Sequence, residues 1–200
     1  FVKNCFVVHN PFFGEVDGAK SAKRNVILSV GRLEPVKGYE IYFDALSRID
    51  KSLLAKWEIL IAGDGSLRES LRELVARLGL EVRFLGHKQD VSELYKKAKI
   101  FVLSSLNEGL SNVLIESAFY GCARLSSDTA GAKELIKDGF SGILFKCGDA
   151  NELASKLENL MRDEALRDAL VQNANESLDE FSQERIIKLW QGLIDRFARK

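Results

Sequence analysis

Short apolar runs alternate along this chain with segments in which apolar residues recur every three or four positions. This alternation constrains the fold more than any other feature, because short continuous apolar runs are typical of strands buried on both faces. The segments between them have the periodicity of amphipathic helices. Strands and helices that alternate with short links form a parallel sheet covered by helices on both faces. The expected strands span residues 6–8, 26–30, 58–62, 82–85, 100–103, 124–126 and 143–145.

Helical periodicity continues beyond the last expected strand. The expected helices span residues 39–49, 67–78, 91–98, 113–120, 132–137, 152–161, 164–178 and 183–198, with Asp149 and Ser182 at N-cap positions. We therefore predict an α/β, Rossmann-like domain of three layers, with a parallel sheet of about six strands in residues 6–160 and extra C-terminal helices in residues 161–200. The apolar side of the last helix packs either on this core or on a further domain: Trp190, Leu193, Ile194 and Phe197.

Composition narrows the classes of function. The 200 residues contain 29 Lys and Arg against 29 Asp and Glu, and this balance argues against a nucleic-acid partner. Cys5, Cys122 and Cys147 form no C-x-x-C pair, which favours buried, reduced thiols in a cytosolic protein. No apolar run reaches the roughly 18 residues of a membrane span. Because the chain starts at Phe1 rather than Met, we interpret it as a piece of a longer polypeptide.

The segment GRLEPVKG, residues 31–38, directly follows one expected strand and precedes an expected helix. Gly31 allows a ligand to approach the backbone closely. Arg32 can bind two phosphate oxygens at once, Lys37 adds a point charge, and the helix N-terminus offers free N–H groups. These features predict a clamp for a diphosphate. A βα loop with solvated basic residues explains this motif equally well when it is taken alone.

Two acids eight positions apart flank another junction of strand and helix. Glu108 lies in the loop NEGLSN, residues 107–112, and Glu116 lies about a turn into the next helix. A carboxylate accepts hydrogen bonds from two adjacent hydroxyls, so this arrangement suits a sugar and a ribose. Taken singly, Glu108 can complement a helix dipole and Glu116 can be a solvated helix residue.

Other strand exits also carry glycine or small polar residues. Residues 62–66, AGDGS, contain part of a dinucleotide fingerprint but lack its third glycine, so a tight turn capped by Asp64 or Ser66 is the better interpretation. The backbone of Gly86 and His87 can face a nucleobase, although an ordinary strand exit explains both residues. Residues 127–131 fit a turn and a helix cap. Because parallel strands end at one edge of their sheet, we expect all these exits to share a rim.

Together, these motifs resemble the C-terminal, donor-binding domain of the family-4, group-1 retaining glycosyltransferases, which have the GT-B fold. The family pattern G-R-L-x-x-x-K-G corresponds to residues 31–38, and E-x7-E corresponds to Glu108 and Glu116. The turns at 62–65 and 138–142 are also similar to family features. The resemblance implies that residues 1–200 are a single nucleotide-sugar-binding domain, one half of a GT-B enzyme of the hexosyltransferase type, from which the N-terminal acceptor domain is absent.

The same resemblance implies roles for the site residues. Arg32 and Lys37 would hold the donor diphosphate, Glu108 would contact the donor sugar, and these three would be the catalytic residues. Glu116 would bind the ribose hydroxyls. Backbone close to the donor would complete the binding set: Gly31, Gly86, His87, Gly109, Leu110, Ser111 and Asn112. The family is typically metal-independent and no D-x-D occurs here, so neither a metal nor another cofactor is expected.

The implied enzyme moves a sugar from a nucleoside diphosphate to a glycan or lipid-linked acceptor in polysaccharide biosynthesis. Its expected location is the cytoplasm, with peripheral contact at the inner face of the membrane through the N-terminal domain as an option. The isolated domain would bind the donor without transferring sugar. The alternatives are a non-catalytic nucleotide-sugar-binding module and, less favoured, an NAD-dependent oxidoreductase domain that uses Gly63 and Gly65. The chain departs from the family pattern at Arg124, which marks either a strand edge or an additional anionic contact.

Overall fold

The computed structural model describes residues 23–178 and 183–198. Six strands form one sheet in the order β3-β2-β1-β4-β5-β6, and every neighbouring pair is parallel. The strands are β1 (Arg24–Val30), β2 (Glu58–Ala62), β3 (Val82–Phe84), β4 (Ala98–Leu103), β5 (Ala123–Ser127) and β6 (Ile143–Phe145). The predicted parallel α/β fold is confirmed. The strand expected at 6–8, together with Cys5 and Ser182, lies outside the described residues.

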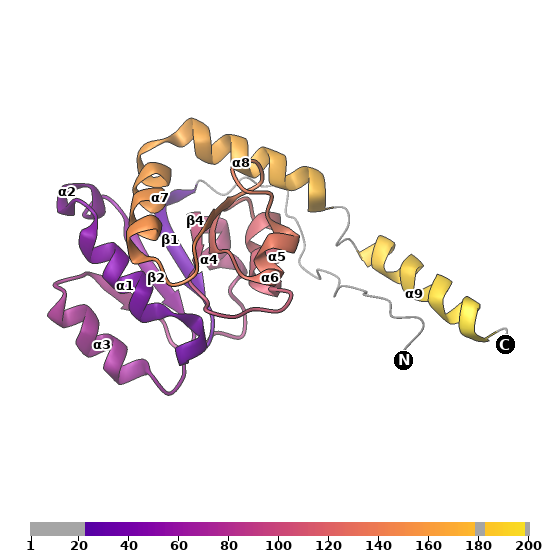
Figure 1. Cartoon of the computed structure of the whole chain (residues 1–200), viewed down its shortest axis with the longest axis horizontal. Coiled ribbons are helices and arrows are strands. Elements are labelled where there is room, and N and C mark those ends of the chain that lie inside the picture. Colours follow the sequence, from indigo (N-terminus) through magenta and orange to yellow (C-terminus); the bar gives the residue numbers. More distant parts are fainter. Residues whose placement is uncertain (1–22, 179–182, 199–200) are drawn as a thin grey trace.

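Helices connect the strands and continue beyond the sheet (Figure 1). They are the 3-10 helix η1 (Pro35–Lys37) and the helices α1 (Tyr39–Arg48), α2 (Lys51–Leu54), α3 (Arg68–Arg77), α4 (Ser92–Lys97), α5 (Asn112–Phe119), α6 (Ala130–Leu135), α7 (Ala150–Arg162), α8 (Glu164–Ser177) and α9 (Gln183–Ala198). The predicted cap at Asp149 is confirmed, because its carboxylate accepts hydrogen bonds from the N–H groups of Asn151 and Glu152, both at 3.0 Å. Helix α2, which the sequence did not predict, is capped in the same way by Asp50.

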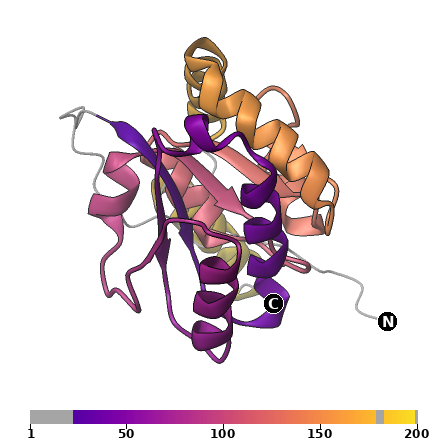
Figure 2. The ribbon, with the colours of Figure 1, turned by 90° about the vertical axis from the view of Figure 1, so that its left-hand side faces the viewer.

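The sheet lies between two helical layers (Figure 2). Side chains alternate along each strand, so in β1 Ile27 enters one apolar cluster while Val26 and Leu28 enter the other. Helices α1, α3 and α7 pack on the first cluster, and α4, α5 and α6 pack on the second. Burial of both sheet faces explains why the strands are continuous apolar runs in the sequence.

The strand order places β1 beside β4 at the centre of the sheet. From β1 the chain proceeds outward through β2 to β3, returns through α4 to β4, and then proceeds outward in the opposite direction. Such a reversal opens a crevice at the carboxyl ends of the two central strands, and ligands of open α/β sheets bind there. The loops that begin at Gly31 and Ser104 flank this position.

Arg124 lies in β5, between β4 and β6, and only 3% of it is exposed. Its guanidinium donates to the carbonyl oxygen of Ser141 at 2.7 Å and to that of Leu114 at 3.4 Å. Burial lowers the pKa of Arg124 to about 10. The predicted strand edge is wrong, because β5 is an inner strand of the sheet, and the contact for an anion stays a prediction. The side chain ties α5 to the turn before β6.

Two further expectations are settled within the described residues. Cys122 is buried as expected, but Cys147 is partly exposed at the end of β6, so the prediction of buried thiols is wrong for Cys147. Trp190, Ile194 and Phe197 are 50–59% exposed on α9, which projects from the sheet in Figure 1, so packing of this face on the core is also wrong. In the part of the chain that is described, each helix is too short or too polar to cross a membrane.

The contacts of Arg124 predict a stability effect. Arg124→Ala would leave the Ser141 carbonyl buried without its donor and would open a cavity, so unfolding free energy should fall by about 3 kcal/mol. Arg124→Met should lose less, because it fills the space and removes a buried charge. Urea denaturation measures both, with Arg83→Ala, which breaks an exposed pair with Glu58, as the control. An unchanged midpoint for Arg124→Ala would refute the structural role.

Candidate functional site

The loops after β1, β2 and β3 are joined by their backbones. Gly31 N–H donates to the Ala62 carbonyl at 3.0 Å, and Gly63 N–H donates to the Gly86 carbonyl at 2.9 Å. A Cβ atom at Gly63 would lie 1.8 Å from the Gly31 carbonyl oxygen, so only glycine allows this approach. Three predicted strand exits therefore form one continuous rim.

The AGDGS segment uses its glycines for contact between protein loops. A Cβ atom at Gly65 would lie 2.5 Å from the carbonyl oxygen of Leu33. Asp64 accepts a hydrogen bond from Gly65 N–H at 2.9 Å, which confirms Asp64 as the cap of the turn. Ser66 is instead held by the carboxylate of Glu34, at 2.7 Å from its hydroxyl. The close approaches that suggested a dinucleotide site are filled by the neighbouring loop, which weakens the oxidoreductase alternative.

The loops after β1 and β4 meet across the point where the strand order reverses. The hydroxyl of Ser104 donates to the carbonyl of Lys37 at 2.9 Å, and Leu106 N–H donates to the carbonyl of Val36 at 2.8 Å. The loop after β4 is joined in turn to α6, because Gly131 N–H donates to the carbonyl of Glu108 at 3.3 Å. The rim thus runs from β3 to the connection before β6.

An ion pair between Lys37 and Glu108 occupies the centre of this rim. The ammonium of Lys37 contacts Oε1 of Glu108 although the residues lie 71 positions apart, and the hydroxyl of Ser105 donates to the same oxygen at 2.8 Å. The side chains are 18% and 13% exposed. Tyr39 lies beside them: its hydroxyl is 3.4 Å from the Gly31 carbonyl, and burial followed by the charge of Glu108 raises the pKa of Tyr39. Two of the three predicted catalytic residues therefore converge.

Glu116 reaches the same edge from helix α5 but has a different partner. The hydroxyl of Tyr95 donates to its Oε2 at 3.0 Å. Burial raises the pKa of Glu116, and the hydrogen bond from Tyr95 opposes this shift. Among the described residues, the hydrogen bond of the Glu116 carboxylate is to Tyr95, and no hydrogen bond or ion pair links it to Lys37 or Glu108. Four side chains were expected to meet at one rim: Arg32, Lys37, Glu108 and Glu116. Among the contacts of the described residues, Lys37 and Glu108 are the pair that touch directly.

The remaining predicted residues are distributed along the rim. Arg32, His87 and Asn112 are exposed, Gly31 and Gly86 take part in the joined backbones described above, and Ser111 is buried at the start of α5. Ser111 is the N-cap of α5 and makes no side-chain capping bond, so its hydroxyl does not satisfy the first N–H groups of this helix. Cations, free N–H groups and carboxylates together can bind a ligand that carries both phosphate and hydroxyl groups.

The sequence did not predict three residues of the site: Tyr39, Tyr95 and Ser105. Ser105 had a usable signal, because it follows the apolar run 100–103 at a strand exit. Tyr39 directly follows the GRLEPVKG segment, which is also a signal. Tyr95 had none, because its contact with Glu116 depends on how α4 packs beside α5. In the described residues no group of three or more His, Cys, Asp or Glu side chains is arranged to hold a metal ion.

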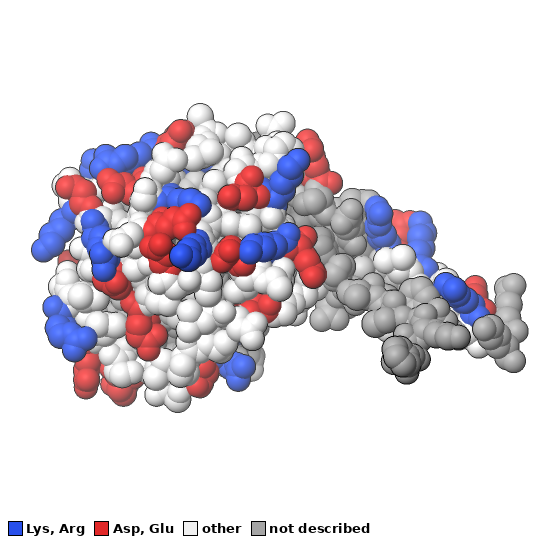
Figure 3. All heavy atoms as spheres, in the orientation of Figure 1, with Lys and Arg blue, Asp and Glu red and all other residues white. Residues whose placement is uncertain are grey.

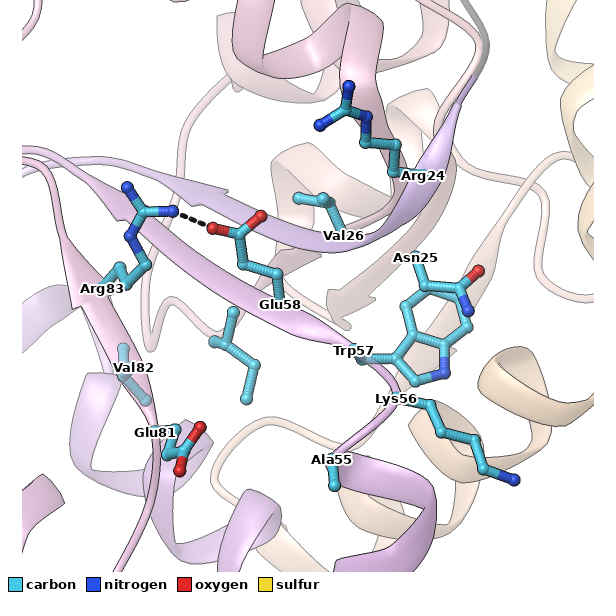
Figure 4. Close-up of a pocket in the computed structure, with 11 residues that line it drawn as sticks. Arg24, Asn25, Val26, Ala55, Lys56, Trp57, Glu58, Glu81, Val82 and Arg83 are labelled. Atoms are coloured by element: carbon cyan, nitrogen blue, oxygen red, sulfur yellow. Dashed lines mark hydrogen bonds and ion pairs between the residues drawn. The ribbon is translucent and has the colours of Figure 1, made fainter.

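A cavity of about 510 Å³ lies at the opposite edge of the sheet, at the amino ends of β1, β2 and β3 (Figure 4). Its lining includes Arg24, Trp57 and Glu81, together with Arg83 and Glu58, which form an ion pair. None of the predicted site residues lines it. Over the face drawn in Figure 3, acidic and basic side chains are interspersed rather than segregated.

Known proteins are similar to this chain in both sequence and fold. The family model described as glycosyl transferases group 1 matches residues 15–177. A Campylobacter jejuni protein named GalNAc-alpha-(1->4)-GalNAc-alpha-(1->3)-diNAcBac-PP-undecaprenol alpha-1,4-N-acetyl-D-galactosaminyltransferase is 41% identical over 198 residues, which cover 97% of this chain and 55% of that protein. A second protein of that organism, N-acetylgalactosamine-N,N'-diacetylbacillosaminyl-diphospho-undecaprenol 4-alpha-N-acetylgalactosaminyltransferase, is 31% identical over 93% of this chain and 52% of its own length.

Among solved structures, Anabaena HepE in complex with UDP-glucose superimposes with a TM-score of 0.78 at 25% identity, covering 90% of this chain and 50% of HepE. The chain therefore spans about half the length of the relatives and structures it matches. The shared fold extends over nearly all of the chain.

The environment of Glu116 predicts how stability depends on pH. Because burial raises the pKa of Glu116, the folded state holds its proton more firmly than the unfolded state, and ionisation costs stability as pH rises through that raised value. Glu116→Gln should therefore melt at the same or a higher temperature than the wild type at pH 7–8. The difference should vanish below about pH 4, where both states are protonated. A variant that melts lower at neutral pH would contradict the assignment.

Proposed function

This chain belongs to the glycosyl transferases group 1 family, and from that membership we propose that it is the donor-binding domain of a retaining glycosyltransferase. The enzyme would move a sugar from a nucleoside diphosphate to a glycan or lipid-linked acceptor. Two relatives are named as N-acetylgalactosaminyltransferases of undecaprenol-linked glycans, and HepE binds UDP-glucose, which supports both the donor class and the acceptor class.

The Lys37–Glu108 pair carries this proposal. It brings a cation and a carboxylate together at the reversal point of the sheet, where α/β domains bind nucleotides. An arriving donor presents a diphosphate, which can replace Glu108 as the partner of Lys37, and a sugar, whose hydroxyls can replace Lys37 as the partner of Glu108. Both charged groups then keep a bonded partner, which matters because an uncompensated, mostly buried charge is costly.

Catalysis then depends on stabilising the diphosphate as it leaves. Negative charge grows on the phosphates while the sugar acquires oxocarbenium character, so Lys37, exposed Arg32 and the first N–H groups of α5 stabilise the transition state more than the ground state. Glu108 orients the sugar, and Glu116 binds the ribose hydroxyls. The backbone at Gly86 and His87 faces the base. We propose that these cations replace a metal ion and that no cofactor is needed.

The complete enzyme would combine this chain with a second, N-terminal domain that binds the acceptor. Support comes from the relatives, about half of whose length this chain matches. Nucleotide sugars and lipid-linked acceptors meet at the cytoplasmic face of a membrane in this scheme. We therefore place the enzyme in the cytoplasm, with peripheral contact at the inner membrane face through the second domain.

Removal of a positive charge from the diphosphate clamp, at Lys37 or Arg32, should abolish most turnover. In the full-length protein, Lys37→Ala or Arg32→Ala should lower kcat by about 10²-fold or more, because each removes a preorganised contact to the leaving diphosphate. Arg83→Ala, which removes an equal charge at the opposite edge of the sheet, is the matched control. Release of nucleoside diphosphate during sugar transfer measures turnover. If correctly folded Lys37→Ala works at the wild-type rate, the clamp is not at this position.

The 200-residue chain should bind a nucleoside diphosphate without transferring sugar. Binding to the native state raises its melting temperature, so a thermal-shift panel of UDP, GDP, ADP and NAD, with and without EDTA, tests ligand class and metal dependence together. We expect one nucleoside diphosphate to stabilise the chain equally in EDTA, and NAD to have no effect. Stabilisation by NAD alone would favour the oxidoreductase, and sugar transfer by this chain would contradict the two-domain scheme.

A further inference from the structure

Tyr95 is fully buried at the inner side of α4, and its hydroxyl is directed at helix α5. The hydroxyl donates to Oε2 of Glu116 at 3.0 Å and lies 3.5 Å from the carbonyl oxygen of Val113, one turn earlier. The contact therefore joins two helices that follow different strands. Among the described residues, it is the one hydrogen bond that the Glu116 carboxylate accepts from a side chain, and the donor carries no formal charge.

The ring of Tyr95 packs against two aromatic neighbours. It stacks on Tyr120 with ring centroids 5.6 Å apart and planes 7° apart, and it packs against Phe101 at a centroid distance of 5.6 Å. Such packing fixes both torsions of the tyrosine side chain, so the hydroxyl has one position. Glu116 has three side-chain torsions and is only partly buried. The rigid partner therefore selects the orientation of the flexible one.

We propose that Tyr95 is the positioning residue for Glu116, and that it thereby sets how strongly the site prefers ribose over 2′-deoxyribose. This inference rests on the proposed function, in which Glu116 binds the ribose of the donor. Oε2 is engaged by Tyr95, which leaves Oε1 and the second lone pair of Oε2 for the two ribose hydroxyls. Binding two adjacent hydroxyls with one carboxylate requires a fixed carboxylate plane, because both hydrogen bonds must be well aligned at once.

Burial and one neighbouring side chain, Tyr95 from α4, bear on the pKa of Glu116. Tyr120, at the end of the same helix as Glu116, has its own pKa raised by burial and, to a smaller extent, by the charge of Glu116. Burial favours the protonated acid, and a protonated acid loses one acceptor position. The hydrogen bond from Tyr95 opposes that effect. Tyr95 thus supports the charge as well as the orientation of Glu116, and neither effect requires Tyr95 to touch the ligand.

The decisive experiment measures affinity ratios on the 200-residue chain by calorimetry. UDP, GDP and ADP are each paired with the 2′-deoxy form, and the ratio of the two Kd values reports the hydrogen bonds to the 2′-hydroxyl. We expect a ratio of about tenfold or more for the wild type. Tyr95→Phe and Glu116→Gln should both reduce it to within about threefold of unity, because the 2′-deoxy forms have only the bond of their 3′-hydroxyl to lose and their affinities therefore fall less.

Two controls separate positioning from general damage. Tyr42→Phe removes an equally buried hydroxyl from α1 and should keep the wild-type ratio. The double variant Tyr95→Phe, Glu116→Gln should show no further loss than Glu116→Gln alone, because the hydroxyl acts through the carboxylate. The double variant also keeps the test valid if Tyr95→Phe lowers stability. Losses caused by general destabilisation would add in the double variant, whereas a loss that acts through Glu116 would not.

The possible outcomes distinguish failure of the positioning role of Tyr95 from failure of the proposed function. A wild-type ratio well above one that persists in Tyr95→Phe but collapses in Glu116→Gln overturns the role of Tyr95 and leaves the proposed function intact. If the ratio persists in both variants, Glu116 does not bind ribose and the positioning role also falls. If no nucleoside diphosphate binds the wild type, the proposed function fails, and this inference fails with it.

Discussion

The reversal of strand order between β1 and β4 is the constraint on which the rest of the structure depends. Because these strands are neighbours, the loops that follow them meet at the centre of one edge of the sheet. The hydroxyl of Ser104 binds the carbonyl of Lys37 there, although the two residues lie 67 positions apart. The Lys37–Glu108 ion pair forms only there. If β4 paired on the other side of β3, the same two residues would lie at opposite ends of the rim.

The ion pair is better understood as a binding determinant than as a source of stability. Both side chains are less than a fifth exposed, so desolvation offsets much of their attraction. Ser105 supplies an additional donor to Glu108, and the alkyl chain of Lys37 passes within 3.7 Å of where a Cβ atom of Gly31 would lie. A ligand that separates the two charges must therefore satisfy both. A diphosphate joined to a sugar does so, whereas phosphate alone would leave the carboxylate unpaired.

Backbone features of this domain and the convergence of Lys37 with Glu108 were predictable from sequence, whereas the other side-chain pairings across the fold were not. The run at residues 100–103 is explained by burial on both faces of the sheet, Gly63 by its close approach to the Gly31 carbonyl, and Gly86 by its positive φ of 69°. Helix α2 was missed because four residues are too few to show a period. Arg124 was misassigned because its partners, Leu114 and Ser141, belong to other elements. The pairing of Tyr95 with Glu116 likewise depends on tertiary packing.

The two acids of the E-x7-E pattern differ in chemistry because their neighbours differ. Glu108 faces a lysine and a serine, so its charge is balanced before a donor arrives. Glu116 faces Tyr95, and burial favours its protonated form. A balanced acid can exchange its partner for sugar hydroxyls at little electrostatic cost, whereas a poorly balanced one gains most from each hydroxyl donor it acquires. Glu116, whose ionised form is disfavoured by burial, is therefore better suited than Glu108 to discriminate between ligands that differ by a single hydroxyl.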